Sequence, residues 1–149
     1  MTRLLIAVSA LAMAAPAWAE TLAVEAGEGA QERLQEALIL AAPGDEVVLA
    51  AGRFVLTDGI SLDVDNVTVR DFALENPKGD GVKSKGADDI VYHRIRVTWT
   101  GGPDAGNGAY GVYPVESSNI LIDGVQVSGA SDAGNYVGQS TNILSLIHI

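Results

Sequence analysis

The sequence predicts an all-β solenoid made of short strands and bends, and two observations support this prediction. The first is a repeat: segments beginning at Asn66, Asp89 and Asn119 start alike, and a fourth start follows at Asn142. These starts are 23, 30 and 23 residues apart. The second is composition, since 17 glycines and only 5% aromatic residues suit tight turns around an aliphatic core. A fixed period of this size is typical of a solenoid.

Each segment carries the same apolar pattern, at offsets 1, 3, 6 and 8 from its start. The residues are Val67, Val69, Phe72 and Leu74, then Ile90, Tyr92, Ile95 and Val97, then Ile120, Ile122, Val125 and Val127. Offsets 1 and 3 alternate as in a strand, and the step from 3 to 6 requires a bend. We therefore expect stacked parallel strands with Val67, Ile90 and Ile120 in one interior column.

Composition limits the classes of partner. At 149 residues the chain is expected to form one domain. Its formal net charge is -10, and an acidic surface without a basic cluster argues against nucleic acid as a partner. The same surface repels an acidic polymer unless cations intervene. Because the chain has no cysteine, a packed core must hold the fold without disulfides.

The first 19 residues predict a secretory signal peptide. Arg3 precedes an apolar run from Leu4 to Ala15, and Ala17-Trp18-Ala19 has the small-x-small form of a cleavage site before Glu20. The alternative is an N-terminal membrane anchor, for which the run is short. The sequence thus predicts an exported protein, periplasmic or extracellular, with no membrane span after signal cleavage.

Residues 20–45 are expected to form a leading strand at 21–24 and a helix at 31–42, which Pro43-Gly44-Asp45 ends. Leu34, Leu38 and Ala41 fall on one face of this helix. Such a helix covers the apolar end of a solenoid. Further strands are expected at 46–49 and 54–56, after which Ile60, Leu62 and Val64 alternate into the first clear repeat.

Several runs resemble the pectate-lyase-like superfamily. The run from Ala41 to Phe54 looks like the N-terminal cap and first coil of its right-handed parallel β-helix proteins. The runs at 99–103, 107–115 and 129–134 resemble one subgroup, exported bacterial β-helix-repeat proteins mostly without an assigned activity. The resemblance covers about residues 30 to 143. It implies a right-handed parallel β-helix with a short N-terminal capping helix.

The resemblance does not choose an activity. The superfamily includes pectate lyases, polygalacturonases and alginate C5-epimerases, and a fold does not select among such functions.

The sequence departs from the subgroup in two places. Members of the subgroup usually carry one more coil before the segment at Asn66, and Asn135 stands where they have an aliphatic residue and where the other coils have Val82 and Val112. A buried Asn without partners costs about 1–3 kcal/mol.

The end of the chain breaks the repeat. Offsets 3 and 6 from Asn142 are Ser145 and His148, where the earlier segments are apolar. Residues 144–149 resemble the translated read-through of a sequencing adapter. We therefore expect a C-terminally truncated chain with a non-native tail from 144 onward, and residues 46–143 as the coils of an incomplete domain. The alternative is a genuine divergent terminal strand.

Stacking the repeats predicts a candidate substrate-binding face. The second coil has seven extra residues, which we place as a loop within 101–108. Lys83, Tyr113 and Tyr136 then form an outward column beside the inward column at 82, 112 and 135. The neighbours of the outward column are Asp80, Tyr110 and Asp132, with Asp104 and Asn107 on the loop. Tyrosines on an outer face are either good strand formers or a platform for sugar rings, with Tyr110, Tyr113, Tyr136 and Asn107 as substrate-binding candidates.

Catalytic residues remain undefined by any motif. A lyase or epimerase needs a group to neutralise the uronate, a base and an acid. The candidates are Asp80, Asp104, Asp132 and Lys83, and the three carboxylates are also the candidate ligands of a Ca²⁺ ion. The paired-aspartate motifs of polygalacturonases and the Asp-Pro-x-Asp motif of alginate epimerases do not occur. His93, with Arg70, Arg94 and Arg96, reads as solvated surface and ion pairs.

Two functional hypotheses follow. The first is an exported β-helix protein that binds a polysaccharide and cleaves or epimerises it, as a lyase, epimerase or glycoside hydrolase. The second is a non-enzymatic scaffold or binding module in the cell envelope. Further coils carrying Asp, Arg or His beside the tyrosine column would favour the enzyme.

Overall fold

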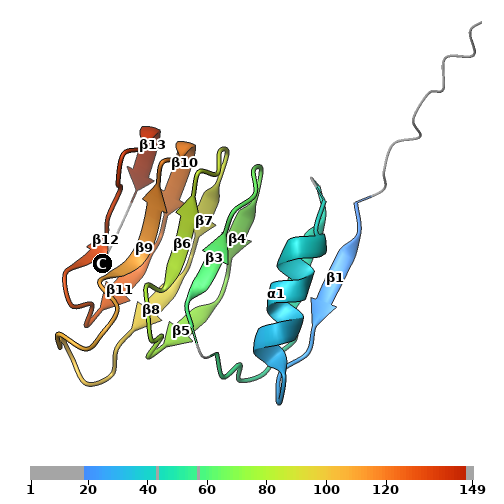
Figure 1. Ribbon diagram of the computed structural model, residues 1–149, viewed down its shortest axis with the longest axis horizontal. Helices are drawn as coiled ribbons and strands as arrows, with labels where there is room; N and C mark the ends of the chain where they lie inside the picture. Colours follow the sequence, from blue (N-terminus) through green and yellow to red (C-terminus); the bar gives the residue numbers. More distant parts are fainter. Residues whose placement is uncertain (1–18, 43, 57, 147–149) are drawn as a thin grey trace, which may run out of the picture.

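The computed structural model describes residues 19–42, 44–56 and 58–146. Its N-terminal layer consists of β1 (Thr21–Val24), α1 (Ala30–Leu40) and β2 (Glu46–Leu49), and β1 pairs with β2 in parallel. This layer, the cap, stands beside a stack of strands (Figure 1). The predicted strands at 21–24 and 46–49 and the predicted helix are confirmed, with small shifts at the helix ends.

The stack contains three parallel sheets, each receiving one strand from successive repeats. Sheet I has the order β12-β9-β6-β3, sheet II the order β13-β10-β7-β4, and sheet III the order β11-β8-β5. Their bounds are β3 (Ile60–Leu62), β4 (Thr68–Arg70), β5 (Ala73–Glu75), β6 (Val82–Lys85), β7 (Val91–His93), β8 (Arg96–Thr98), β9 (Tyr110–Val115), β10 (Ser118–Asp123), β11 (Gln126–Ser128), β12 (Ala133–Asn135) and β13 (Thr141–Leu146). The chain visits sheets I, II and III in turn, an arrangement compatible with a β-helix-like solenoid (Figure 1).

The register of the strands confirms the predicted interior columns. Val69, Tyr92 and Ile122 are partners across sheet II. The amide of Val91 donates to the carbonyl of Val67, and the amide of Leu121 to that of Ile90, each at 2.9 Å. These bonds put Val67, Ile90 and Ile120 in one column. Ile90 and Ile120 are buried and Val67, next to the cap, is half-buried.

Left-handed backbone conformations produce the bends. The residue that starts each repeat has a positive φ: 60° at Asn66, 60° at Asp89 and 56° at Asn119. Asn and Asp tolerate this region better than other residues with a Cβ. Five residues later a second bend follows in every repeat, with φ values of 62° at Asp71, 49° at Arg94 and 65° at Gly124. This second bend is the one that the step from offset 3 to offset 6 predicts.

The core is mainly aliphatic, with Trp99 among its buried side chains, and it contains a hydrogen-bonded pair of hydroxyls. The hydroxyl of Tyr92 on sheet II donates to Oγ of Ser84 on sheet I at 2.6 Å, and both residues are fully buried. Burial raises the pKa of Tyr92 to about 12. The hydrogen bond satisfies two hydroxyls that would otherwise be costly inside the stack.

The strand predicted at 54–56 is wrong. These residues belong to no strand, although Phe54 and Leu56 still pack against the core and Val55 is 69% exposed. The segment has the alternating burial of a strand. It pairs with no strand of sheet III, whose first strand along the chain is β5.

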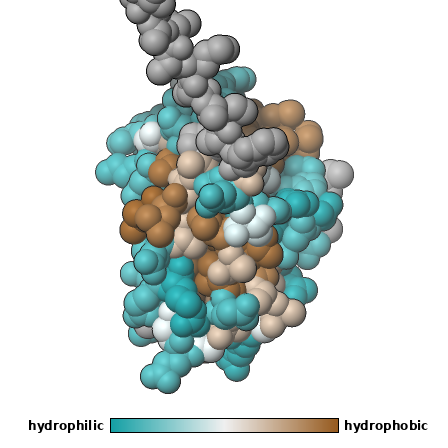
Figure 2. All heavy atoms as spheres, turned by 90° about the vertical axis from the view of Figure 1, so that its right-hand side faces the viewer, coloured by the Kyte–Doolittle hydropathy of each residue, from teal (hydrophilic) through white to brown (hydrophobic). Residues whose placement is uncertain are grey.

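The cap and the stack do not share a sheet. Between them lies a cavity of about 970 Å³, lined by Leu34 and Leu38 of α1, Val47 of β2, and Val69 and Phe72 of the first coil, among others. One ion pair crosses from β2 to β4, from Glu46 Oε1 to Arg70 Nη2 at 3.4 Å. Seen from the cap end, apolar side chains reach the surface among hydrophilic ones (Figure 2).

Some sequence-based predictions lie outside the described residues. The signal peptide falls almost wholly within residues 1–18, and His148 within 147–149. Residues 144–146 continue β13 beside β10, and Leu144 and Leu146 are 55% and 42% exposed. Within the described ranges, no helix is both long and apolar enough to cross a membrane.

Candidate functional site

The outer face of sheet I carries the predicted column. Lys83 pairs with Tyr113 across β6 and β9, and Ser61 of β3 pairs with Lys83 on the other side. The amide of Tyr136 donates to the carbonyl of Val112 at 3.0 Å, which continues the register beyond β12. We call Ser61, Lys83, Tyr113 and Tyr136 the outer row. The inward neighbours Val82, Val112 and Asn135 also align as expected.

Tyr110 joins the outer row to form a cluster of three tyrosines. Its ring lies 4.8 Å from that of Tyr136 at an interplanar angle of 15°, which is a stacked arrangement. The Tyr113 ring is tilted against both, with centroids 4.7 Å from Tyr110 and 5.6 Å from Tyr136. Tyr136 is 43% exposed and the other two are half-buried. The sequence places Tyr113 and Tyr136 side by side but does not show that Tyr110 packs against both.

Two carboxylates hold Tyr110 from either side. Its amide donates to Oδ1 of Asp80 at 3.1 Å, and its hydroxyl donates to Oδ2 of Asp132 at 3.3 Å. Partial removal from water raises the pKa of the Tyr110 hydroxyl, and the negative charge of Asp132 and the hydrogen bond to it act in the same direction. These surroundings favour the neutral form of the Tyr110 hydroxyl.

Lys83 and Gly138 complete the cluster. The Nζ atom of Lys83 lies 5.1 Å from the centre of the Tyr113 ring, within the range of a cation–π contact. At Gly138 a Cβ atom would stand 3.2 Å from Cε2 of Tyr113 and 3.3 Å from Cε1 of Tyr136. The absence of a side chain there lets the two rings approach the strand, a role that sequence reasoning missed.

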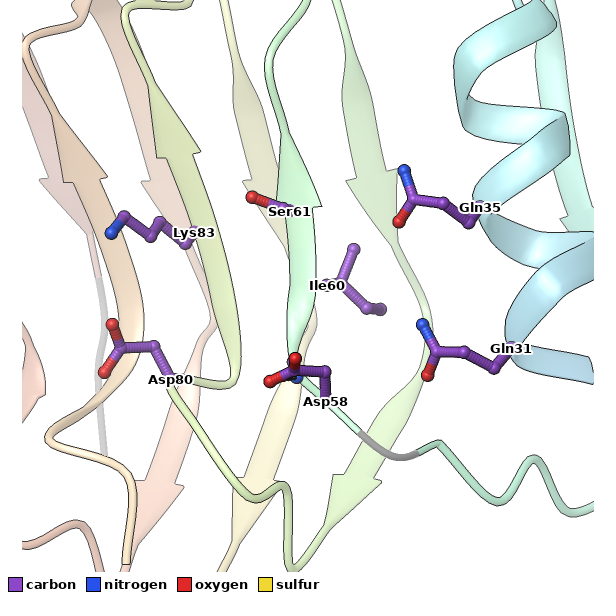
Figure 3. A pocket seen from close by; sticks show the side chains of 8 residues that line it. Gln31, Gln35, Asp58, Ile60, Ser61, Asp80 and Lys83 are labelled. Atoms are coloured by element: carbon purple, nitrogen blue, oxygen red, sulfur yellow. Dashed lines mark hydrogen bonds between the residues drawn. The ribbon is translucent and has the colours of Figure 1, made fainter.

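A polar groove continues the face toward the cap. It has a volume of about 330 Å³ and lies between α1 and β3. The polar side chains around it are those of Gln31, Gln35, Asp58, Ser61, Asp80 and Lys83. Figure 3 shows the glutamines reaching from α1 toward β3, with Asp58 and Asp80 at one level on successive coils. Sequence reasoning missed the groove because only packing of the helix beside the stack creates it.

The loop at 101–108 is held by its own polar side chains. Nδ2 of Asn107 donates to the carbonyls of Gly102 and Gly129, at 2.9 and 2.7 Å. Oδ1 of Asp104 accepts the amide of Gly106 at 2.8 Å. The extra residues loop out where the spacing predicts. Asn107 links this loop to the next coil through these hydrogen bonds. The side chain predicted to bind substrate therefore has a structural role.

The described residues form no cluster of three acidic, histidine or cysteine side chains suited to a metal ion. Asp80 and Asp132 both bond to Tyr110, and Asp104 bonds within its own loop. The structure therefore does not assemble these three carboxylates as the predicted Ca²⁺ ligands.

The basic residues of sheet II and its bends form surface ion pairs. Nδ1 of His93 lies 3.0 Å from Oδ2 of Asp123, and Nε of Arg94 lies 2.6 Å from Oδ1 of Asp71. All four side chains are at least partly exposed, so these pairs contribute little to stability. This agrees with the expectation of ion pairing.

Comparison with known proteins adds no relative: no protein-family model matches the chain, and no match was found among curated proteins or solved structures.

Proposed function

We propose that this chain forms an exported right-handed parallel β-helix of the pectate-lyase-like kind, and that the outer face of sheet I binds a polysaccharide. The observation that supports this most is the cluster of Tyr110, Tyr113 and Tyr136 on the outer face of sheet I. The three parallel sheets with one strand per repeat support the fold.

The cluster has the chemistry that a sugar ring requires. Tyrosine offers an apolar ring face for C–H groups and a hydroxyl for hydrogen bonding. Asp80 and Asp132 flank the rings and are acceptors for sugar hydroxyls. The rings already pack on one another, so little side-chain entropy is lost on binding.

Binding is the function proposed, and chemistry on the sugar is not part of it. A lyase or epimerase needs a base beside the sugar. A tyrosine with its usual pKa of about 10 is protonated at neutral pH, and the pKa of Tyr110 is shifted further upward by removal from water and by Asp132. Asp80 and Asp132, two of the predicted catalytic candidates, bond to Tyr110 and thereby position it.

The test is calorimetric titration of the full chain with a panel of neutral and acidic oligosaccharides. Tyr113→Ala should weaken binding by about 0.5–1.5 kcal/mol, the range of an aromatic contact. The control is Leu121→Ala, a half-buried apolar residue on sheet II, which should leave the affinity of the folded protein unchanged. Absence of binding across the panel by folded protein would leave the scaffold hypothesis in its place.

A further inference from the structure

The outer row and the polar groove form one continuous surface. The row crosses β3, β6 and β9 at Ser61, Lys83 and Tyr113, and it continues to Tyr136 directly after β12. Lys83 belongs to both parts, since it lines the groove and lies over the Tyr113 ring. Adjacent strands are about 4.8 Å apart, so the row spans roughly 14 Å along the stack. A pyranose repeat has a length similar to one strand spacing.

A second row runs parallel to the first and carries negative charge. Asp58 lies two residues before Ile60 and Asp80 two residues before its partner Val82, so the two carboxylates share a register position on successive coils. Both line the groove, and Figure 3 shows them near one level on neighbouring coils. Asp132 continues the negative charge beside Tyr110.

The charges along this surface do not balance. Lys83 is the cation among the described groove residues, and its amine is directed to the Tyr113 ring. The groove also holds the carboxylates of Asp58 and Asp80, and the carboxylate of Asp132 lies beside Tyr110. The net charge of the whole chain is -10. A ligand with a carboxylate on every sugar would meet repulsion along its length, because like charges in a shared groove disfavour each other.

We propose that the ligand is a glycan chain of at least four sugars without carboxylates, lying along the stack from the tyrosine cluster into the groove beside α1. This rests on the proposed carbohydrate-binding function and names its substrate class. Sugar rings stack on the tyrosines at one end. At the other end, Gln31, Gln35, Asp58 and Asp80 supply amide and carboxylate partners for hydroxyl groups.

The experiment uses pairs of hexasaccharides that differ only at C6, where one member has CH₂OH and the other a carboxylate. Glucose, mannose and galactose backbones give three such pairs. Calorimetric titration of the full chain should show binding of at least one neutral hexasaccharide, with its oxidised partner bound at least about tenfold more weakly. Because exposed charges are screened by salt, this ratio should shrink as the salt is raised to about 1 M.

Variants separate the charge argument from a general loss of binding. Asp58→Asn should reduce the affinity ratio of neutral to oxidised hexasaccharide. The variant keeps a side-chain oxygen for the Gly59 amide, which donates to Oδ1 of Asp58 at 3.3 Å. Glu75→Gln removes an exposed carboxylate from sheet III and should leave the ratio unchanged. A disaccharide should bind more weakly than the hexasaccharide, because it cannot reach the groove.

The outcomes distinguish the two proposals. Equal or tighter binding of the oxidised member overturns this inference and leaves carbohydrate binding intact. The inference is also overturned if Asp58→Asn and Glu75→Gln reduce the affinity ratio of neutral to oxidised hexasaccharide equally. The effect would then come from overall charge. Failure of folded protein to bind any member of the three pairs overturns the proposed function itself.

Discussion

Two polar residues inside the stack have opposite hydrogen-bonding situations. Tyr92 spans the core and donates to Ser84 at 2.6 Å. Asn135, in register with Val112, has a buried Oδ1 without a hydrogen-bond partner in the described structure. The Tyr92 hydroxyl is therefore satisfied. The buried oxygen of Asn135 is not, and it carries the energetic cost expected of an Asn in an aliphatic column.

Alkaline pH should destabilise the protein through Tyr92. Its pKa is raised from the usual value of about 10 to about 12 in the folded state. The stability gained from keeping Tyr92 neutral is therefore complete below about pH 10 and lost as the pH rises through about 12. The expected loss is about 2–3 kcal/mol.

Urea denaturation at about pH 9, 10, 11 and 12 measures this loss. Tyr92→Phe should be less stable at pH 9 by about 1–2 kcal/mol, because Ser84 loses its partner. It should also show a smaller decline between about pH 10 and 12. If the free energy of unfolding declined equally in the wild-type protein and in Tyr92→Phe, groups other than Tyr92 would cause the alkaline effect.

At the scale of strands and bends, each coil depends on residues with positive φ. Asp89 starts the second repeat with a φ of 60° and is exposed. Its backbone is tied to the next coil, since its amide donates to the carbonyl of Ser118 at 3.0 Å. The bend therefore depends on the backbone conformation of Asp89 more than on its side chain.

Asp89→Val should lower the free energy of unfolding by about 1–2 kcal/mol, the cost of a left-handed conformation for a residue with a branched Cβ. Asp89→Gly should change it much less, because glycine adopts this conformation freely. Chemical denaturation of both variants measures the difference. Equal losses would mean that the carboxylate of Asp89, and not its backbone, stabilises the bend.

At the scale of the whole molecule, the cap and the stack are two layers with separate hydrogen-bonding. β2 pairs only with β1 among the described strands, whereas β7 lies between β4 and β10. The cavity of about 970 Å³ separates β2 from the first coil. The two layers share a hydrophobic cluster, which includes Leu34 and Ile60, but no strand pairing joins β2 to the stack among the described strands. Backbone protection can therefore differ between cap and stack.

Hydrogen exchange followed by mass spectrometry should reflect this division. Amides of β1 and β2 should exchange at least about tenfold faster than those of β7, because local stability follows buried contacts and paired strands. The amides of β10, which pair with β7 and β13, provide the comparison within the stack. Uniform protection across cap and stack would show that the two layers unfold as one unit.

Much of the stack follows from the sequence alone, for a physical reason. A repeat of apolar residues at fixed offsets determines which side chains face inward, and the step from offset 3 to offset 6 predicts a bend. Parallel pairing then aligns equivalent positions, so the columns at 82, 112 and 135 and at 83, 113 and 136 could be predicted. The loop at 101–108 followed from the longer second spacing.

The tertiary structure decided what lies between elements that share no repeat. Only packing shows that Tyr110 stacks on Tyr136, that Gly138 makes room for the rings, and that α1 forms a groove with β3. The strand expected at 54–56 is lost because it has no partner. A repeating pattern shows which side chains of a coil face inward. The cap does not belong to the repeat, so its packing against the stack, through residues such as Leu34 and Ile60, is not encoded by the pattern.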